Sequence, residues 1–347
     1  MPNTYIPLLE VTRGTSVESL HFGAAAVVDP SGRLVASLGD PNLVTFMRSS
    51  AKPFQAIHFI ELGGADRFHF EDAEVAIMCA SHSGTDLHYE TICSMQAKTG
   101  IHETDLLCGT HPPFHKPTAL ALAARGESPT PNRHNCSGKH TGMLAQTVMR
   151  GLPKENYLEF DHPVQMANLQ SIAEMCDLPG EQIQLGIDGC SAPVHALPLY
   201  NAALGYARLA NPSGLAAERA AACQRITSAM RTHPEMVAGP DRLDTHLMRA
   251  AQGKCFSKMG AEGYQAVGVM PGVLPNFPDG LGITIKISDG DSDSRARNVI
   301  TLEILRLLGL EVPPIEGLQP FWDWKVYNWR KMEVGQLRPC FQLQFQS

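Results

Sequence analysis

The chain has 347 residues, which is enough for one large domain or two ordinary ones with a core that can support an active-site cleft. Hydrophobic residues make up 44% of the sequence and charged residues 18%, and no segment approaches the run of about 20 apolar residues that a membrane span needs. The formal net charge is -7 and the lysines and arginines are scattered, so we expect neither nucleic acid nor a membrane as a partner.

Residues 1–14 lack the basic region, apolar segment and small-residue cleavage site of a secretory signal. The nine cysteines form no CxxC pair and no regular spacing. In a reducing compartment such cysteines are more often buried thiols, metal ligands or catalytic groups than disulfides. We therefore expect a cytoplasmic protein.

Strand and helix patterns then follow along the chain. Residues 8–40 alternate and turn like antiparallel strands. From Ser49 onward the apolar spacing is that of helices, which we expect at 50–64, 71–80, 86–100, 117–126, 138–151, 162–176 and 214–231. Strand character returns at 183–188, 253–258, 264–270 and 281–291, and a last helix is expected at 292–309.

Strands near both ends with helices between them predict an α+β fold, in which one antiparallel sheet is built from the two termini and a helical region is inserted. We expect a single catalytic domain, residues 1–347. Its sheet portion is predicted at about 1–48 and 183–347, and its helical portion at about 49–182.

Residues 47–56, MRSSAKPFQA, place two serines, a lysine and a proline just before an apolar run. If a helix begins at Ser49 or Ser50, Pro53 falls among the first four residues, whose N–H groups have no intrahelical partner. Residues three apart share a helix face, so the Ser49 hydroxyl and a neutral Lys52 amine can meet as nucleophile and base. The same stretch is equally typical of a helix cap with a surface lysine, because serines often cap helices.

A second serine-rich stretch, residues 79–84 (CASHSG), contains Ser81 and is by itself typical of a helix C-terminus and turn. Further along, Lys258 lies at the end of a predicted strand and is followed by Met259. Serine β-lactamases and penicillin-binding proteins use S-x-x-K, S-x-N and K-T-G in this order. The match is loose, because the asparagine and the threonine of that pattern are both replaced here.

A third stretch, residues 133–144 (RHNCSGKHTGML), reads as a loop entering a helix and holds Cys136 and Lys139. Cys190 follows the strand predicted at 183–188. Two cysteines on separate loops are a weak zinc signal by spacing alone, and buried thiols are the commoner case. The residues themselves leave both interpretations open.

Taken together, these stretches resemble the thermolabile L-asparaginase II family of the Rhizobium etli type. The resemblance is carried by MRSSAKPFQA, CASHSG, HNCSGKH, GIDGCSAP, SKMGAEG and KISDGD, which span residues 47–291. It implies a fold like that of serine β-lactamases and penicillin-binding proteins, a homodimer, and hydrolysis of L-asparagine to L-aspartate and ammonia. It also implies two Ser/Lys pairs, Ser49 with Lys52 and Ser81 with Lys258.

The resemblance further implies a zinc ion held by Cys136, Lys139 and Cys190, with Asp188 as a neighbour. All these positions carry the matching residue type. Met259 departs from the family, which tends to have threonine there, and this leaves the hydrogen bonding around Lys258 open.

For the mechanism we assign Ser49 as nucleophile and Lys52 as its base, with Ser81 and Lys258 as a proton relay. The zinc is expected to position the substrate. Further substrate contacts are expected from Arg48, His134 and Asp188, although Arg48 can instead pair structurally with an acidic residue. The alternatives are a related amidase or β-lactamase-like hydrolase acting on another amide, and a non-catalytic zinc-binding scaffold.

Overall fold

A computed structural model describes residues 4–346, and the chain divides into two compact units. A sheet unit comprises Met1–Met47, Leu197–Asn211 and His246–Ser347, and a helical unit comprises Arg48–Ala196 and Pro212–Thr245. The interpretation of residues 1–347 as one catalytic domain stays a prediction.

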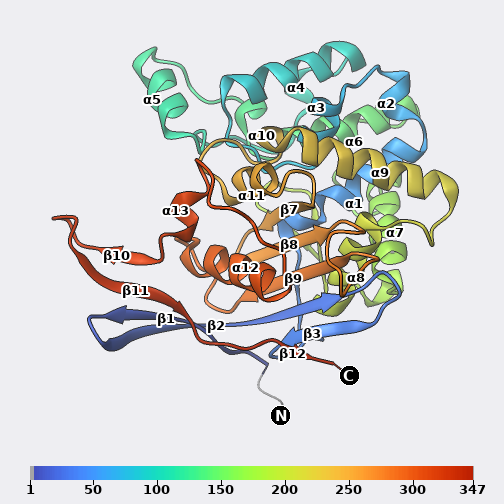
Figure 1. The fold of residues 1–347 in the computed structure, drawn as a ribbon. Helices are drawn as coiled ribbons and strands as arrows, with labels where there is room; N and C mark the ends of the chain where they lie inside the picture. Colours follow the sequence, from blue (N-terminus) through green and yellow to red (C-terminus); the bar gives the residue numbers. More distant parts are fainter. Residues whose placement is uncertain (1–3, 347) are drawn as a thin grey trace. The chain divides into compact units, whose positions relative to one another are not determined.

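A large antiparallel sheet forms the centre of the sheet unit (Figure 1). Its strands follow the order β10-β11-β1-β2-β9-β8-β7, and β3 pairs with both β2 and β12. The strands are β1 (Ile6–Arg13), β2 (Ser16–Val28), β3 (Leu34–Leu38), β7 (Cys255–Gly260), β8 (Tyr264–Val269), β9 (Leu281–Ile287), β10 (Lys325–Tyr327), β11 (Glu333–Pro339) and β12 (Gln344–Phe345). The predicted sheet from both ends of the chain is thus confirmed.

Two helices pack on this sheet, α8 (Leu199–Ala210) and α12 (Arg295–Leu307). Every residue of β8 and β9 is buried, as expected of strands in the middle of a covered sheet. Gly282 of β9 permits the close approach of α8, because a Cβ there would lie 1.8 Å from the Ala203 carbonyl oxygen. The α+β class, with helices packed on an antiparallel sheet, is confirmed.

Some elements differ from the prediction. The strand expected at 183–188 is β5 (Gln184–Ile187), and it pairs with β6 (Pro193–Pro198) instead of joining the large sheet. The short β5 is largely exposed. By contrast, β9 of the large sheet is covered by helices and fully buried. The sequence patterns also did not predict β6, α8, α11 (Leu243–Ala251), α13 (Gln319–Trp322) or the strands after residue 320.

The helical unit is built around α6 (Ser137–Met149), whose residues 137–147 are all buried. A helix that is buried on all sides lies in a core, and α6 contacts α1, α3, α4 and α7. The helices of this unit are α1 (Lys52–Glu61), α2 (Gly64–Arg67), α3 (Asp72–Met78), α4 (Asp86–Thr99), α5 (Lys116–Ala124), α6, α7 (Pro163–Cys176), α9 (Ala217–Thr232) and α10 (Pro234–Val237). Within residues 4–346, no helix combines the length and the hydropathy needed to cross a bilayer.

Candidate active site in the helical unit

The stretch RSSAK forms a 3-10 turn, Arg48–Ala51, that leads into α1 at Lys52. Pro53 lies in the first turn of α1, as the pattern predicted. Arg48 adopts a φ of 51°, a backbone conformation that is uncommon outside glycine and typical of functional turns. Ser49 and Lys52 are both buried, but among the described residues no hydrogen bond joins them.

Lys52 instead connects two other segments of the helical unit, the Ser81 loop and the segment that carries Cys136. Its Nζ donates to the carbonyl oxygen of Ala80, lies 3.1 Å from the Ser81 Oγ and lies 3.2 Å from the Cys136 Sγ. An ammonium group has three N–H bonds, and these three acceptors satisfy all of them. The lysine of the first motif therefore meets the serine of the second and a cysteine of the third.

The loop that carries Ser81 is fixed on both sides. The Ser81 N–H donates to the Val237 carbonyl over 2.9 Å, and the Ser83 hydroxyl donates to the Ala238 carbonyl over 2.7 Å. His82 accepts from the Gly84 N–H at Nδ1, so its Nε2–H donates to the Ser137 Oγ over 2.9 Å. Because these contacts hold it on α6 and next to α10, the loop is more than the plain helix end that CASHSG suggests by itself.

Burial keeps the histidines beside this loop neutral. Burial lowers the pKa of His82 well below its usual value, and it lowers that of His88 to about 4. The two rings stack with centroids 4.9 Å apart. A neutral ring can accept at one nitrogen and donate at the other, which is how both histidines brace the loop.

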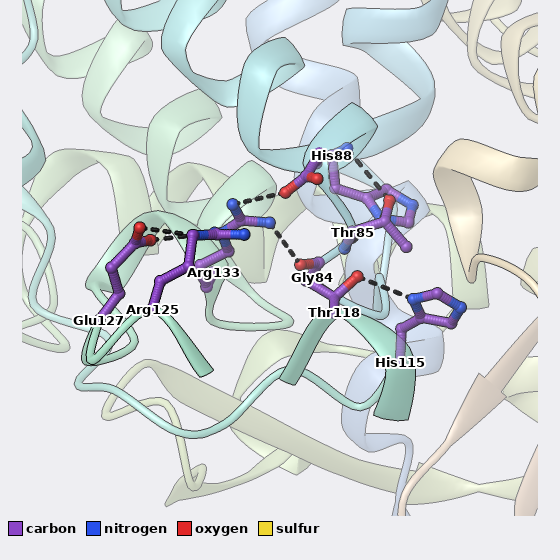
Figure 2. Close-up of polar contacts among 9 residues, drawn as sticks. Gly84, Thr85, His88, His115, Thr118, Arg125, Glu127 and Arg133 are labelled. Atoms are coloured by element: carbon purple, nitrogen blue, oxygen red, sulfur yellow. Dashed lines mark hydrogen bonds and ion pairs between the residues drawn. The ribbon is translucent and has the colours of Figure 1, made fainter. Parts of the chain in front are cut away.

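Arg133 links the Ser81 loop to the segment that precedes α6. Its guanidinium Nη1 donates to the Gly84 carbonyl over 3.0 Å (Figure 2). Its Nη2 lies 2.7 Å from the Asp86 carboxylate. The guanidinium also lies over the Tyr89 ring, 4.5 Å from its centroid. The neighbouring Thr85 caps α4 by exchanging hydrogen bonds with His88 (Figure 2). Sequence reasoning missed Arg133, and its place directly before HNCSGKH was the only available signal.

The three residues of the predicted zinc site lie together in the helical unit. Cys136 is the N-cap of α6, Lys139 lies in the first turn of α6, and Cys190 follows β5. The Lys139 Nζ lies 3.0 Å from the Cys190 Sγ, and the Cys136 thiol shares a hydrogen bond with Cys190. All three side chains are buried. The sequence spacing left a metal site and buried thiols open, and the structure shows that the buried donors converge.

Electrostatics in this cluster favour a thiolate on Cys190. The hydrogen bond from Cys136 lowers the pKa of Cys190, and the neighbouring Lys139 and His140 lower it further. The same hydrogen bond and burial raise the pKa of Cys136. Burial opposes the charge on Lys139, but the combined effects of Cys190, Cys136 and Asp188 outweigh it and raise the pKa of the lysine. Without a metal, these effects favour an ammonium on Lys139 and a thiolate on Cys190 over a thiolate on Cys136.

Two sulfurs and one amine nitrogen form a donor set that suits zinc, with one position of a tetrahedron left for another ligand. No group of three His, Cys, Asp or Glu side chains within residues 4–346 could hold a metal ion. A metal at this site would therefore depend on the lysine amine, which must lose its proton to bind.

Arg48 and Asp188 form an ion pair in the helical unit. Arg48 Nε and Nη2 donate to the same Asp188 oxygen over 2.9 and 2.7 Å. The Asp188 charge also acts on Lys139, which places this carboxylate near the cysteine–lysine cluster. The structural pairing of Arg48 with an acidic residue, one of the two expectations for it, is therefore present.

His134 is buried beside the Cys136 loop. Its Nδ1 accepts from the Cys136 N–H over 3.0 Å, so a neutral ring carries its proton on Nε2. Burial and the neighbouring His111 lower the pKa of His134 to about 3. The ring can thus offer one N–H donor but no positive charge to a substrate carboxylate.

Lys258 lies on β7 of the sheet unit and is buried there. Its Nζ donates to the Met259 carbonyl over 2.8 Å. The pairing of Lys258 with Ser81 stays a prediction, as does the effect of methionine at position 259.

The comparison with curated proteins gives no significant match. Among solved structures, a probable glutaminase from Bacillus subtilis is 14% identical, with 84% of this chain and 89% of that chain covered and a TM-score of 0.40. A Bacillus glutaminase is 15% identical, with 84% and 92% covered and a TM-score of 0.39. A β-lactamase from Mycobacterium bovis is 14% identical, with 82% and 94% covered and a TM-score of 0.38.

These structural likenesses are remote, so the family assignment rests on the sequence. The family model of L-asparaginase II matches residues 9–339, which is nearly the whole chain. The protein therefore belongs to the L-asparaginase II family and is a hydrolase of amide bonds.

Proposed function

We propose that the protein hydrolyses L-asparagine to L-aspartate and ammonia by covalent catalysis. Family membership supports the substrate class. The observation that carries the chemistry is the position of Lys52, whose Nζ reaches both the Ser81 Oγ and the Cys136 Sγ. A lysine, a serine and the cysteine–lysine cluster thus meet in one buried region, as covalent amide hydrolysis with a positioned substrate requires.

In the proposed reaction a serine Oγ attacks the side-chain amide carbon, and its proton passes to a neutral lysine amine. The carbonyl electron pair moves to the oxygen, and backbone N–H groups at the start of α1 stabilise the oxyanion. The carbon–nitrogen bond then breaks as the nitrogen takes the proton, which releases ammonia. Water attacks the resulting ester, and L-aspartate leaves with the serine restored.

Ser49 is the proposed nucleophile, Lys52 its base, and Ser81 with Lys258 the proton relay. Ser81 is a second candidate nucleophile, because the hydrogen bond from Lys52 goes to Ser81 and none joins Lys52 to Ser49 within residues 4–346. A neutral Lys52 at 3.1 Å can accept the Ser81 hydroxyl proton directly. Attack by Ser49 requires Lys52 to change partners or Ser81 to relay the proton.

Zinc is the proposed cofactor, held by Cys136, Lys139 and Cys190. When bound, it supplies a Lewis-acid charge that can orient an oxygen of the substrate. Arg48 and His134 are proposed to contact the substrate carboxylate, the first with guanidinium N–H groups and the second with its Nε2–H. Asp188 holds Arg48 in place for this contact. The protein is further proposed to act as a homodimer in the cytoplasm. Light scattering of the purified protein can test whether it is a dimer.

The test is ammonia release from L-asparagine and L-glutamine by the wild type and by Ser49→Ala and Ser81→Ala. We expect turnover of asparagine and its loss in both variants. Mass spectrometry after rapid acid quench then locates the acyl group, and an adduct on Ser81 reverses the proposed roles of the two serines. Turnover of glutamine alone would point to the related amidase, and no turnover of either substrate would refute the proposal.

A further inference from the structure

His140 is a fully buried histidine in the first turn of α6, directly after Lys139. Its Nδ1 lies 2.6 Å from the Tyr157 Oη, and the Tyr157 side chain is also fully buried. The ring of Tyr157 meets the imidazole edge to face, with centroids 5.7 Å apart. The imidazole is therefore held firmly on one side.

The hydrogen bonds of Tyr157 decide where the imidazole proton lies. The Tyr157 Oη accepts the Leu107 N–H over 3.0 Å. Its own O–H then has the His140 Nδ1 as an acceptor, and Nδ1 must be unprotonated to accept it. An imidazole whose Nδ1 is unprotonated is neutral and carries its proton on Nε2.

This Nε2 has no hydrogen-bond partner of good geometry within residues 4–346. A buried N–H donor without an acceptor destabilises the fold, so each such donor in a native structure needs an explanation. The groups around Nε2 indicate which acceptor it serves. His140 lies one helical turn after Cys136 in α6, and its ring interacts with the Cys190 side chain. The remaining N–H donor of the ring thus belongs to the cluster that contains a sulfur of the proposed zinc site.

We propose that His140, held by Tyr157 as the Nε2–H tautomer, is a positioning residue that donates an N–H···S hydrogen bond to the Cys190 thiolate when zinc is bound. The inference rests on the proposed function, because it presumes that Cys190 is a zinc ligand. Metal ligands commonly depend on such outer hydrogen bonds, and their loss weakens metal binding about 10–100-fold.

Three variants separate this role from simple packing. His140→Met fills the space without an N–H, His140→Gln keeps an amide N–H near the position of Nε2, and Tyr157→Phe removes the hydroxyl that selects the tautomer. Zinc affinity is measured by competition with a chromogenic chelator, after circular dichroism and thermal melts have established that each variant folds. We expect His140→Met to lose about 10–100-fold in zinc affinity, His140→Gln to lose less than it does, and Tyr157→Phe to fall between wild type and His140→Met.

A cobalt-substituted protein supplies a readout that packing alone does not move. Loss of a hydrogen bond to a thiolate raises the energy of the sulfur lone pair, so the thiolate-to-cobalt charge-transfer band of His140→Met should shift to longer wavelength. Its intensity should still indicate two thiolates. In the metal-free wild type, nitrogen-15 shifts of the His140 ring should show the proton on Nε2.

Several results would overturn the inference. A His140→Met variant with wild-type zinc affinity and an unshifted cobalt band would do so, as would an Nδ1–H tautomer in the wild type. A wild-type protein that binds no zinc would refute the zinc site of the proposed function itself. That failure appears in the wild type, whereas failure of the His140 role appears only in the variants, so the two are distinguishable.

Discussion

Gly138 offers a test of how tightly the candidate site is built. It lies in the first turn of α6, between the cap residue Cys136 and Lys139. A Cβ at this position would lie 2.1 Å from the carbonyl oxygen of Ile77 and 2.7 Å from its carbonyl carbon. Real Cβ atoms almost never come closer than 3.0 Å to such an atom, so the first turn of α6 must shift by about an ångström to accept a methyl group.

We expect Gly138→Ala to destabilise the protein by about 1–3 kcal/mol, the usual cost of overpacking against atoms that cannot move aside. Helix propensity alone predicts the opposite sign, because alanine is favoured over glycine by about 1 kcal/mol in a helix. The shift also displaces Cys136 and Lys139, and a 1 Å misplacement can cost about 100-fold in rate. Urea unfolding and ammonia release measure the two effects.

Gly142 is the matched control, one turn further along the same buried helix. A Cβ there would meet only the side chain of Met78, at 2.7 Å from its terminal methyl, and a methionine can change rotamer. Gly142→Ala should therefore stay within about 1 kcal/mol of wild type and keep most of its activity. A Gly138→Ala variant that matches Gly142→Ala in stability and turnover would refute this account of the packing of α6 on α3.

Three further predictions concern other parts of the helical unit. Burial lowers the pKa of His88 from an ordinary 6.5 to about 4. Between pH 6.5 and 4 the unfolded chain therefore binds more protons than the folded one, and the free energy of unfolding falls as the pH drops through this range. Between pH 6.5 and 4, the free energy of unfolding of His88→Gln should fall by roughly 3 kcal/mol less than that of the wild type. His102→Gln, at an exposed position, should behave as the wild type. Equal pH dependence in the wild type and both variants would contradict this prediction. Arg133→Met should lower the free energy of unfolding in urea by about 2 kcal/mol and slow ammonia release, because the Gly84 carbonyl loses a charged donor. Rescue by Arg133→Lys would show that a positive charge alone is enough to hold the Gly84 carbonyl. Chelation of the proposed zinc should raise KM for asparagine more than it lowers kcat, and it should be easier at low pH because the ligands regain protons. Kinetics at several asparagine concentrations measure both constants, and a fall in kcat at constant KM would contradict the proposed positioning role.

Much of the fold could be predicted because its signals are local. The helix α12 and the strand β9 carry apolar residues at the right period, with polar residues marking their ends. The strands β10 and β12 are only three and two residues long, and their pairing depends on β11 and β3. Such short elements are defined by distant partners, so no local pattern predicts them.

The candidate site divides in the same way. The residue types of the cysteine–lysine cluster were predicted, and the structure brings them together. The helical spacing of Ser49 and Lys52 predicted a contact that this structure does not show, because the lysine side chain reaches Ser81 and Cys136 instead. That choice depends on how α1, α3 and α6 pack together, which residue spacing does not encode. Arg133 and Tyr157 escaped prediction for the same reason, since their roles come from partners about 50 residues away.

The crowded first turn of α6 has a consequence for laboratory evolution. Ser137, Lys139 and His140 each bind a different segment of the chain, and Gly138 leaves no room for a side chain. Random mutagenesis should therefore return almost no active clones with changes in these four positions. Mutational libraries are better directed to exposed positions such as those of α5, while this turn is held constant.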